Sequence, residues 1–334
     1  MLERAYQNGW SRGANWLVYD RHWQLPAKTE LWSFELFMEN KTFLPKNIEF
    51  IFFPWASLID AIDHNNIKIA NELLSALDNI PPRFGIKRVT VAQHIFCDRY
   101  VEVFKRAKVS AIFWSHKRLN EHCLSGVKIL PYCLYPVMAM KYSTSETIPL
   151  DRRKYLFNFI GSYQEGLYLS KIRQELFKLK GDAVNSIYIR KRNEWHFEGD
   201  VYRNQINGLL DGELAVKKKL YEEKEYVHAL SNSKFTLCPS GSGPNSIRIW
   251  ESLLFGSIPV ILSDGLDLIN ESVLSDIVVK FSENDFSGKQ IFSRLSEFDF
   301  SEYDEKLELV KENYIKMFGL DLKWCNWDSV IIGE

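Results

Sequence analysis

The stretch from Ser233 to Asp264 constrains the fold more than any other part of the chain. Apolar runs at 235–238 and 258–262 have the length of buried strands, and a helix with apolar positions lies between them. The helix follows a turn rich in Gly and Ser and ends at Gly256, a residue type typical of helix C-caps. A strand, a helix and a second strand in this order predict a βαβ unit in a parallel sheet.

The helix of this unit carries Arg248 and Glu251, which are three residues apart and therefore share one face. It begins at a polar turn, where free backbone N–H groups can receive a phosphate. Arg248 is suited to a diphosphate, and Glu251 to a pair of sugar hydroxyls. The two can instead form a salt bridge, or Glu251 can be a solvated glutamate, although the apolar neighbours Trp250, Leu253 and Leu254 favour a buried helix. Together they predict a site for a nucleotide-sugar.

The bulk composition fits two domains of ordinary size, since the chain has 334 residues. A net charge of -1 argues against a general nucleic-acid binder, which needs a basic surplus. The five cysteines lack metal-type spacing and are expected to be reduced thiols of a cytoplasmic protein. No apolar signal core is found near the N-terminus, and no window reaches the roughly 18 apolar residues of a membrane span.

The first half of the chain alternates strand-like and helix-like patterns, which predicts βαβ units and a parallel sheet. The expected strands are 48–55, 88–95, 111–114 and 128–135, and the expected helices are 67–77 and 100–107. The first 45 residues hold four tryptophans and are not assigned to either a core or a cleft.

The polar segment 141–151 is the best linker candidate, and the alternation restarts after it. The expected strands of the second half are 155–160, 186–190, 235–238, 258–262 and 277–281, and the expected helices are 167–179, 213–230 and 302–317. We therefore expect an acceptor-side domain over 1–145, a nucleotide-sugar-binding domain over 152–300 and a helical tail over 301–334. The tail can cross back to the first domain.

The segment from Ser233 to Asp264 resembles the exostosin-like family of glycosyltransferases. The resemblance rests on the Ser-Lys-Phe strand start, on Cys-Pro-Ser-Gly, and on positions that fall in register without a gap: Ser246, Arg248, Glu251, Gly256, Pro259 and Asp264. It covers 32 of the 334 residues directly. The strand from Phe157 to Ser162, followed by a helix that contains Arg173, resembles the start of the same domain more weakly.

The resemblance implies an α/β fold with two Rossmann-like domains that face each other across a cleft, the GT-B architecture. It also implies inverting transfer of a sugar from a nucleoside-diphosphate sugar, without a bound cofactor or catalytic metal. The chain departs from the family in its turn from Gly241 to Asn245, and we expect it to lack the membrane anchor of eukaryotic members. The sugar and its acceptor therefore cannot be carried over.

Residues expected to bind the donor come from three places in the second half. They are Gly161 and Ser162 after the first strand, Arg190 after the second strand, and Ser240, Gly241, Asn245, Ser246, Arg248 and Glu251. Each has a plainer alternative. Gly161 and Ser162 can belong to an ordinary loop, Arg190 to a solvated charged run, and Asn245 and Ser246 can simply cap the helix.

An inverting transferase needs a base for the acceptor hydroxyl. His94 lies at the carboxyl end of an expected strand, which is the end where such sheets bind ligands, and Asp98 follows closely. We choose His94 first and Asp98 second. His116 ends the next strand, and Asp20 and His22 lie in the aromatic N-terminal stretch. A single histidine at a strand end can also be structural.

The resulting hypothesis is a cytoplasmic glycosyltransferase of bacterial surface polysaccharide synthesis. Its partners would be a nucleotide-sugar donor and a glycan or lipid-linked glycan acceptor. It would bind no nucleic acid and would contact the inner membrane at most peripherally. The alternatives are a fucosyltransferase-like GT-B enzyme and a non-catalytic sugar- or nucleotide-binding protein on the same fold.

Overall fold

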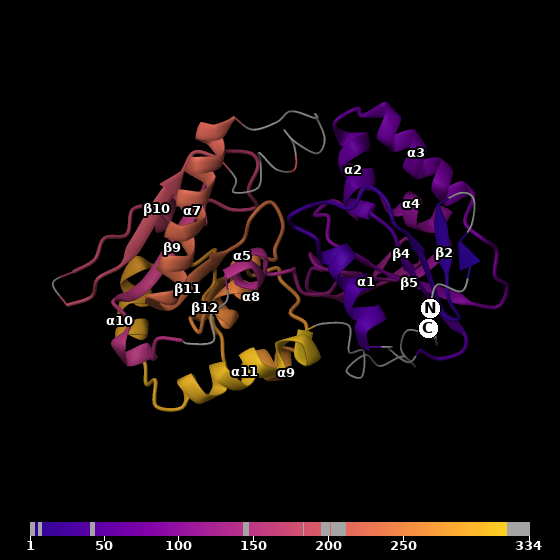
Figure 1. Cartoon of the computed structure of the whole chain (residues 1–334). Helices are drawn as coiled ribbons and strands as arrows, with labels where there is room; N and C mark the ends of the chain where they lie inside the picture. The colour runs from indigo at the N-terminus through magenta and orange to yellow at the C-terminus, as the bar shows by residue number, and fades with distance from the viewer. Residues whose placement is uncertain are drawn as a thin grey trace.

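The computed structural model describes residues 4–5, 9–40, 44–142, 147–182, 184–194, 201 and 212–318. These residues form two α/β domains that lie side by side, each around its own sheet (Figure 1). The strands of the first sheet fall between residues 4 and 131, and those of the second between 155 and 280. The structure thus confirms the predicted fold class. None of the helices in the described ranges is long and apolar enough to cross a membrane.

The first domain has an eight-stranded sheet in the order β1-β2-β3-β4-β5-β6-β8-β7. Its central strands run parallel, and these are β3, β4, β5, β6 and β8. The edge strands β1, β2 and β7 pair antiparallel with their neighbours. The strands are β1 (Arg4–Ala5), β2 (Trp10–Arg12), β3 (Trp16–Tyr19), β4 (Ile48–Phe52), β5 (Lys87–Ala92), β6 (Val109–Trp114), β7 (Cys123–Leu124) and β8 (Val127–Pro131).

Helices cover both faces of this sheet because its strands are apolar on both sides. Phe50 and Phe52 of β4 belong to the core that includes α1, whereas Ile51 between them belongs to the core of α2, α3 and α4. The side chain of Asn66 caps α3 by accepting a hydrogen bond from the Ile69 backbone N–H. The helices are α1 (Thr29–Asn40), α2 (Trp55–Asp63), α3 (Ile67–Asp78), α4 (Val101–Arg106) and α5 (Val137–Tyr142).

The tryptophan-rich N-terminal stretch is part of the core of the first domain. Trp10 of β2 packs in the cluster of α2 to α4, and Trp16 of β3 and Trp32 of α1 pack in the opposite cluster. Trp23 is only partly buried against the core. The aromatic residues of this stretch therefore extend the sheet and cover it.

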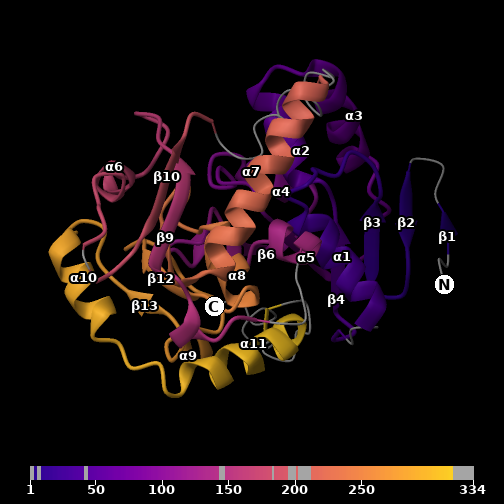
Figure 2. The same ribbon diagram turned by 60° about the vertical axis from the view of Figure 1, so that its left-hand side comes forward.

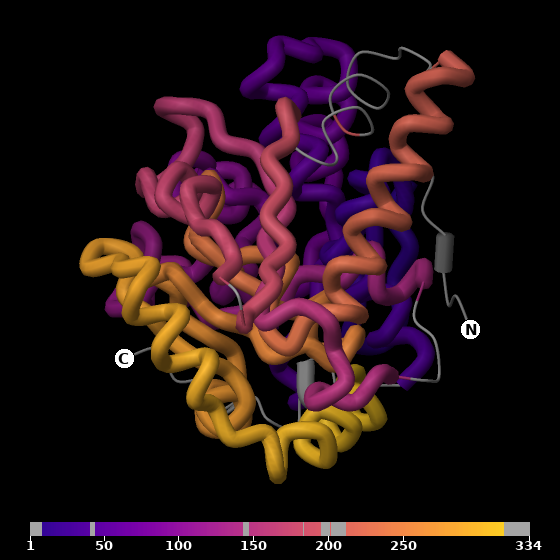
Figure 3. The backbone as a smooth tube through the Cα atoms, turned by 90° about the vertical axis from the view of Figure 1, so that its left-hand side faces the viewer, coloured from indigo at the N-terminus to yellow at the C-terminus, as the bar shows by residue number. Residues whose placement is uncertain are grey.

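The second domain has a wholly parallel five-stranded sheet in the order β10-β9-β11-β12-β13. Figures 2 and 3 show α7 on one side of this sheet and α10 on the other. The strands are β9 (Tyr155–Ser162), β10 (Tyr188–Arg192), β11 (Ser233–Pro239), β12 (Ile258–Leu262) and β13 (Val279–Lys280). The helices are η1 (Leu150–Arg152), α6 (Ile172–Leu176), α7 (Glu213–Ser231), α8 (Ile247–Leu254), α9 (Glu271–Leu274), α10 (Gly288–Ser296) and α11 (Tyr303–Phe318).

The C-terminal helix α11 lies against the second domain, where its residues Leu307, Val310 and Tyr314 join the core that contains α8. Asp304 of α11 accepts a hydrogen bond from the Leu150 backbone N–H. Tyr314 of α11 also packs in the core cluster that contains Tyr132 and Cys133 of the first domain, and the rest of the tail, after residue 318, lies outside the described residues.

Two local expectations in the second domain are wrong. The helix expected over 167–179 is only α6, and Leu167 and Leu169 before it are exposed, so their apolar spacing is not used for packing. β9 does not stop at residue 160 but continues through Gly161 and Ser162, because β10 pairs with the strand as far as Ser162. Only long-range pairing with β10 could reveal this.

Candidate active site

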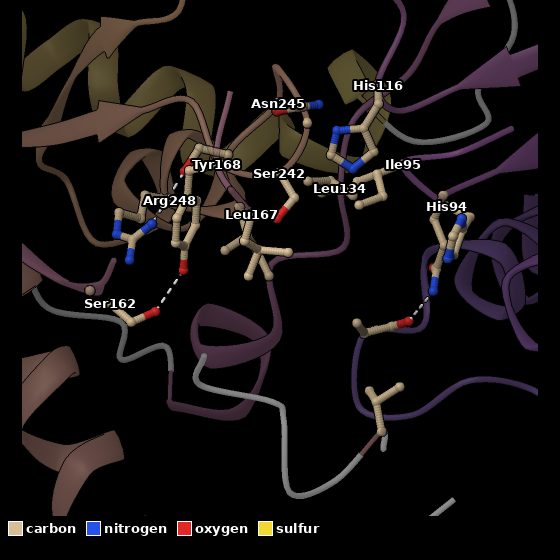
Figure 4. A pocket seen from close by; sticks show the side chains of 18 of the residues that line it. His94, Ile95, His116, Leu134, Ser162, Leu167, Tyr168, Ser242, Asn245 and Arg248 are labelled. Atoms are coloured by element: carbon tan, nitrogen blue, oxygen red, sulfur yellow. Dashed lines mark hydrogen bonds between the residues drawn. The ribbon is translucent and has the colours of Figure 1, made fainter. Parts of the chain in front are cut away.

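A cavity of about 400 Å3 lies between the two domains. His94 and His116 reach it from loops that follow β5 and β6 of the first domain (Figure 4). Ser162 at the end of β9 and Arg248 of α8 reach it from the second domain. The carboxyl ends of both parallel sheets therefore meet at one space, where ligands of such folds bind.

Most of the residues predicted for the site line this cavity. Those that do are His94, Gly161, Ser162, Gly241, Asn245, Ser246, Arg248 and Glu251. Asp98, Arg190 and Ser240 do not line it. Within the described ranges, no three His, Cys, Asp or Glu side chains come close enough to hold a metal ion.

Arg248 is held by the end of β9. Its Nε lies 3.2 Å from the carbonyl oxygen of Ile160, to which Nη2 also donates. The guanidinium lies 5.2 Å from the ring centre of Phe159, and Nη1 is 3.5 Å from Ser246 Oγ. The alternative salt bridge with Glu251 is not formed, since Arg248 donates to the strand instead. Its charge is therefore available to a ligand in the cavity.

Arg173 is a second arginine of the cavity, which the sequence did not assign to the site. Its Nε donates to the Ser240 carbonyl oxygen at 2.9 Å and its Nη1 to that of Ser162 at 3.1 Å. The guanidinium stacks 4.4 Å from the ring centre of Tyr168. Burial, and then the positive charge of Arg248, lower the pKa of Arg173 to about 9. The group stays charged at neutral pH.

The two guanidiniums are close to each other beside glycines. A Cβ at Gly161 would lie 2.9 Å from Arg248 Nη2 and 3.3 Å from Arg173 Nη1. A Cβ at Gly241 would lie 3.4 Å from Arg173 Nη2. Among the described residues, the two arginines donate to backbone carbonyl oxygens and to Ser246 Oγ, and neither forms a salt bridge with a carboxylate. Arg173 is buried and Arg248 is partly buried, and the two like charges repel each other, so this corner of the cavity favours a polyvalent anion.

Glu251 is buried in α8, one helical turn after Arg248. One carboxylate oxygen accepts the backbone N–H of Met138 at 2.8 Å, and the other accepts the Tyr226 hydroxyl at 2.6 Å. Burial raises the pKa of Glu251 to about 7. The carboxylate lines the cavity while it also ties α8 to α5 and α7. Its role toward sugar hydroxyls stays a prediction.

Asn245 bridges the two domains and does not cap α8. Its amide nitrogen donates to the carbonyl oxygen of Ser115 at 2.7 Å and to that of Tyr132 at 3.4 Å. Its side-chain oxygen accepts the indole N–H of Trp250 at 3.0 Å. Ser246 occupies the N-cap position of α8, but its side chain makes no capping hydrogen bond. The capping interpretation of these two residues is therefore wrong.

His94 lies in the cavity wall with both ring nitrogens engaged. Nδ1 is 3.1 Å from the backbone N–H of Phe96, and Nε2 is 3.2 Å from Asp60 Oδ1. Since a backbone N–H can only donate, Nδ1 is the acceptor, and the neutral ring carries its proton on Nε2. This tautomer has no open lone pair for a substrate hydroxyl. The geometry therefore argues against His94 as the first choice of base.

Three predicted residues point elsewhere because they are paired outside the cavity. Asp98 accepts from Arg118 at 3.1 Å. The exposed side chain of Arg190 lies beside Glu225, and Arg192, two residues further along β10, lines the cavity in its place. Ser240 donates its hydroxyl to Glu283, which does not line the cavity. Pairing partners distant in sequence decided these positions.

The sequence also passed over Asp60 and did not choose His116. Asp60 of α2 is buried and lines the cavity, and its helix begins just after β4 reaches the ligand-binding edge. That position was the signal that could have identified it. His116 is buried, its Nδ1 has no hydrogen-bond partner, and burial lowers its pKa to about 3. A Cβ at Gly243 would lie 2.5 Å from that nitrogen.

Comparisons with known proteins agree with the predicted family. Residues 11–289 match the model of the exostosin GT47 domain. Ribitol-5-phosphate xylosyltransferase 1 of Mus musculus is 30% identical over 135 residues, which are 40% of this chain and 24% of that protein. A probable glucuronosyltransferase of Oryza sativa subsp. japonica is 31% identical over 113 residues, 31% of this chain and 26% of that protein. Exostosin-1c of Danio rerio is 33% identical over 120 residues, 35% of this chain and 15% of that protein.

The matched regions span between 15% and 26% of the length of these relatives. Among solved structures, an alpha-glucosyltransferase in complex with UDP and a 13-mer DNA containing a central A:G mismatch aligns with a TM-score of 0.44 and 17% identity. The alignment covers 79% of this chain and 75% of that one. Because the family model matches well over half of the residues, the chain belongs to the exostosin GT47 family, a family of glycosyltransferases.

Proposed function

We propose that the chain transfers a sugar from a nucleoside-diphosphate sugar to a hydroxyl group, with inversion at the anomeric carbon. The observation that carries the proposal is the pair Arg173 and Arg248, which meet in the cavity without a carboxylate between them. A diphosphate carries two or more negative charges, which would balance the positive charges of the two guanidiniums. Membership of a glycosyltransferase family supports the same reading.

The chemistry follows from where charge develops during transfer. As the bond between the anomeric carbon and the diphosphate oxygen breaks, its electron pair leaves with the diphosphate. Arg173 and Arg248 are held in place by strand and turn carbonyl groups before the donor arrives, so they stabilise this charge without reorganising. The donor would then lie against the second domain, with the acceptor against the first.

The finer parts of the proposal rest on the sequence. We infer a growing glycan or lipid-linked glycan as acceptor, a role in bacterial surface polysaccharide synthesis, and a cytoplasmic enzyme with at most peripheral contact at the inner membrane. The relatives named above come from mouse, rice and zebrafish. Deleting the gene in the source cell and analysing its surface glycans tests this part, and unchanged glycans would contradict it.

Thermal unfolding of the full chain with UDP, GDP and CMP tests donor binding, because a ligand that binds the folded state raises the melting temperature. One of these nucleotides should stabilise the wild type, and Arg248→Ala should abolish most of that shift. Arg294→Ala is the matched control, since Arg294 is exposed on α10 and lies outside the cavity. An unchanged shift in Arg248→Ala would contradict the assigned phosphate role.

Turnover separates an enzyme from a binding protein on the same fold. Sugar nucleotides of the base that stabilises the protein should release nucleoside diphosphate when incubated with the wild type. The anomeric configuration of the product, read by proton NMR, should be opposite to that of the donor. Retained configuration would rule out the inverting mechanism.

A further inference from the structure

We propose that Asp60 is the base that removes the proton from the acceptor hydroxyl, and that His94 and Gln24 position it. This inference rests on the proposed transfer reaction and assigns a step of it. Asp60 lies in α2 of the first domain, buried yet lining the cavity. Arg173 and Arg248 line the same cavity from the second domain.

The position of Asp60 suits a transfer that inverts the configuration of the anomeric carbon. In an inverting transfer the acceptor attacks from the face opposite the leaving diphosphate, so the base must lie across the cavity from the anion site. Asp60 is in the opposite domain from both arginines, and the cavity lies between the domains. A sugar bound through its diphosphate at the arginines would present its anomeric carbon toward the first domain.

Two donors hold the Asp60 carboxylate and leave it able to accept a proton. Oδ1 receives the N–H of His94 Nε2 at 3.2 Å, and Oδ2 receives the amide of Gln24. Each carboxylate oxygen has a second lone pair that these bonds do not use. The ring of His94 has no such lone pair, because Nδ1 is occupied by the Phe96 backbone N–H.

The orientation of both donors is fixed by the chain behind them. Gln93 donates its amide to Gln24 Oε1 at 2.8 Å and also to the Ala27 carbonyl oxygen. The oxygen of Gln24 is therefore turned to Gln93, and its NH₂ group to Asp60. The Phe96 N–H fixes the His94 tautomer in the same way. Such support is what a positioned catalytic group needs.

The other acidic groups of the cavity fit the role less well. Glu251 lies in the second domain, on the side of the arginines, with both oxygens bonded to protein groups. Glu194 is exposed and also belongs to the second domain. Asp63 is exposed and bonded to the Tyr100 hydroxyl. His64 lines the cavity as well, but its ring is exposed, whereas Asp60 is shielded from water.

The proposed step balances. The acceptor O–H proton passes to an Asp60 carboxylate oxygen as the acceptor oxygen bonds to the anomeric carbon. The bond from that carbon to the diphosphate oxygen breaks, and its electron pair leaves with the nucleoside diphosphate. Asp60 later loses the proton to water.

The main test compares Asp60→Asn with Asp63→Asn, which makes the same change in the same helix. With the UDP- or GDP-sugar that the wild type uses, Asp60→Asn should lower kcat by about 100-fold or more. Its melting-temperature shift with UDP or GDP should stay that of the wild type. Asp63→Asn should keep both turnover and shift. Wild-type turnover in Asp60→Asn would overturn this proposal alone, whereas a wild type that binds no nucleoside diphosphate would overturn the proposed function and this step together.

Azide distinguishes a base from a residue that only supports the structure. The azide ion attacks the anomeric carbon without a proton to remove, and forms a glycosyl azide as nucleoside diphosphate leaves. Azide should therefore raise nucleoside-diphosphate release by Asp60→Asn far more than by the wild type. Release that does not respond to azide would contradict the base assignment.

His94 provides an independent comparison if Asp60→Asn folds poorly. His94→Gln keeps an N–H donor for Asp60 and should retain most of the turnover, whereas His94→Leu should lose much of it. Equal loss in both variants would make His94 the base instead and would overturn the proposal. His64→Gln should turn over like the wild type, and a loss there as large as in Asp60→Asn would equally count against Asp60.

Discussion

Asn245 in the second domain donates its side-chain amide to the carbonyl oxygen of Ser115 in the first domain, at 2.7 Å. The same side chain accepts the indole N–H of Trp250, so one buried amide joins the helix α8 to the opposite domain. Nearby, the Leu119 N–H donates to the Gly265 carbonyl oxygen across the same boundary. These contacts fix how the two walls of the cavity face each other.

Replacing Asn245 by alanine should destabilise the protein and weaken this connection. The change removes the hydrogen bond that Asn245 accepts from the Trp250 indole N–H and the one that it donates to the Ser115 carbonyl oxygen, and a buried hydrogen bond contributes about 0.5–1.5 kcal/mol. Urea unfolding measures the difference. Asn193→Ala, at an exposed position, is the control and should stay within about 0.5 kcal/mol of the wild type. Equal stability of the two variants would show that the bridge contributes nothing.

The arginine pair should bind inorganic pyrophosphate even without a nucleotide. The anion would relieve the repulsion between Arg173 and Arg248, so pyrophosphate should raise the melting temperature, and less so at high salt. Removing Arg248 should weaken binding by roughly 10-fold to 100-fold, which corresponds to about 1.5–3 kcal/mol for a charge-assisted bond. Calorimetric titration gives the affinities. Pyrophosphate binding of equal strength in Arg248→Ala would contradict the anion site.

Gly161→Ala should impair nucleotide binding more than it impairs folding. The new Cβ would meet Arg248 Nη2 at 2.9 Å and Arg173 Nη1 at 3.3 Å, so both guanidiniums must move. The affinity for the stabilising nucleoside diphosphate should fall by roughly 10-fold, about 1.4 kcal/mol. Gly265→Ala is the control, because a Cβ there would meet nothing within 4 Å. The prediction fails if both variants bind as the wild type does.

Stability should fall as the pH rises from 7 to 8 because of Glu30. Burial raises the pKa of Glu30 to about 8, so the folded protein holds a proton that the unfolded chain releases near 4.5. The unfolding free energy then decreases with pH, by at most about 1.4 kcal/mol per pH unit. His116, whose pKa is lowered to about 3, acts with the opposite sign but only below pH 6.5.

Glu30→Gln should flatten this dependence between pH 7 and 8. The amide oxygen can still accept the N–H groups of Ala56 and Gln93 that Glu30 binds. Glu251→Gln is a useful contrast. Because the pKa of Glu251 is about 7, its contribution to the fall of the unfolding free energy with pH ends at a lower pH than that of Glu30. Chemical unfolding at several pH values measures both. A slope that persists unchanged in Glu30→Gln would assign it to another group.

The sequence by itself determined the elements whose signal is local. β11, α8 and β12 lie where the apolar runs and the Gly/Ser turn between 233 and 264 predict them. Short apolar strands and a helix started by a turn depend mostly on neighbours along the chain. The two α/β domains follow from the same pattern, as does the placement of Arg248 in the cavity.

Only the tertiary structure decided which distant groups share the cavity. Arg173 meets Arg248 because carbonyl groups at the ends of β9 and β11 orient its side chain. Asp60 faces the cavity because α2 packs after β4, and Asn245 reaches the other domain instead of capping its own helix. These relationships join residues dozens of positions apart. They depend on sheet order and domain packing, which local periodicity does not encode.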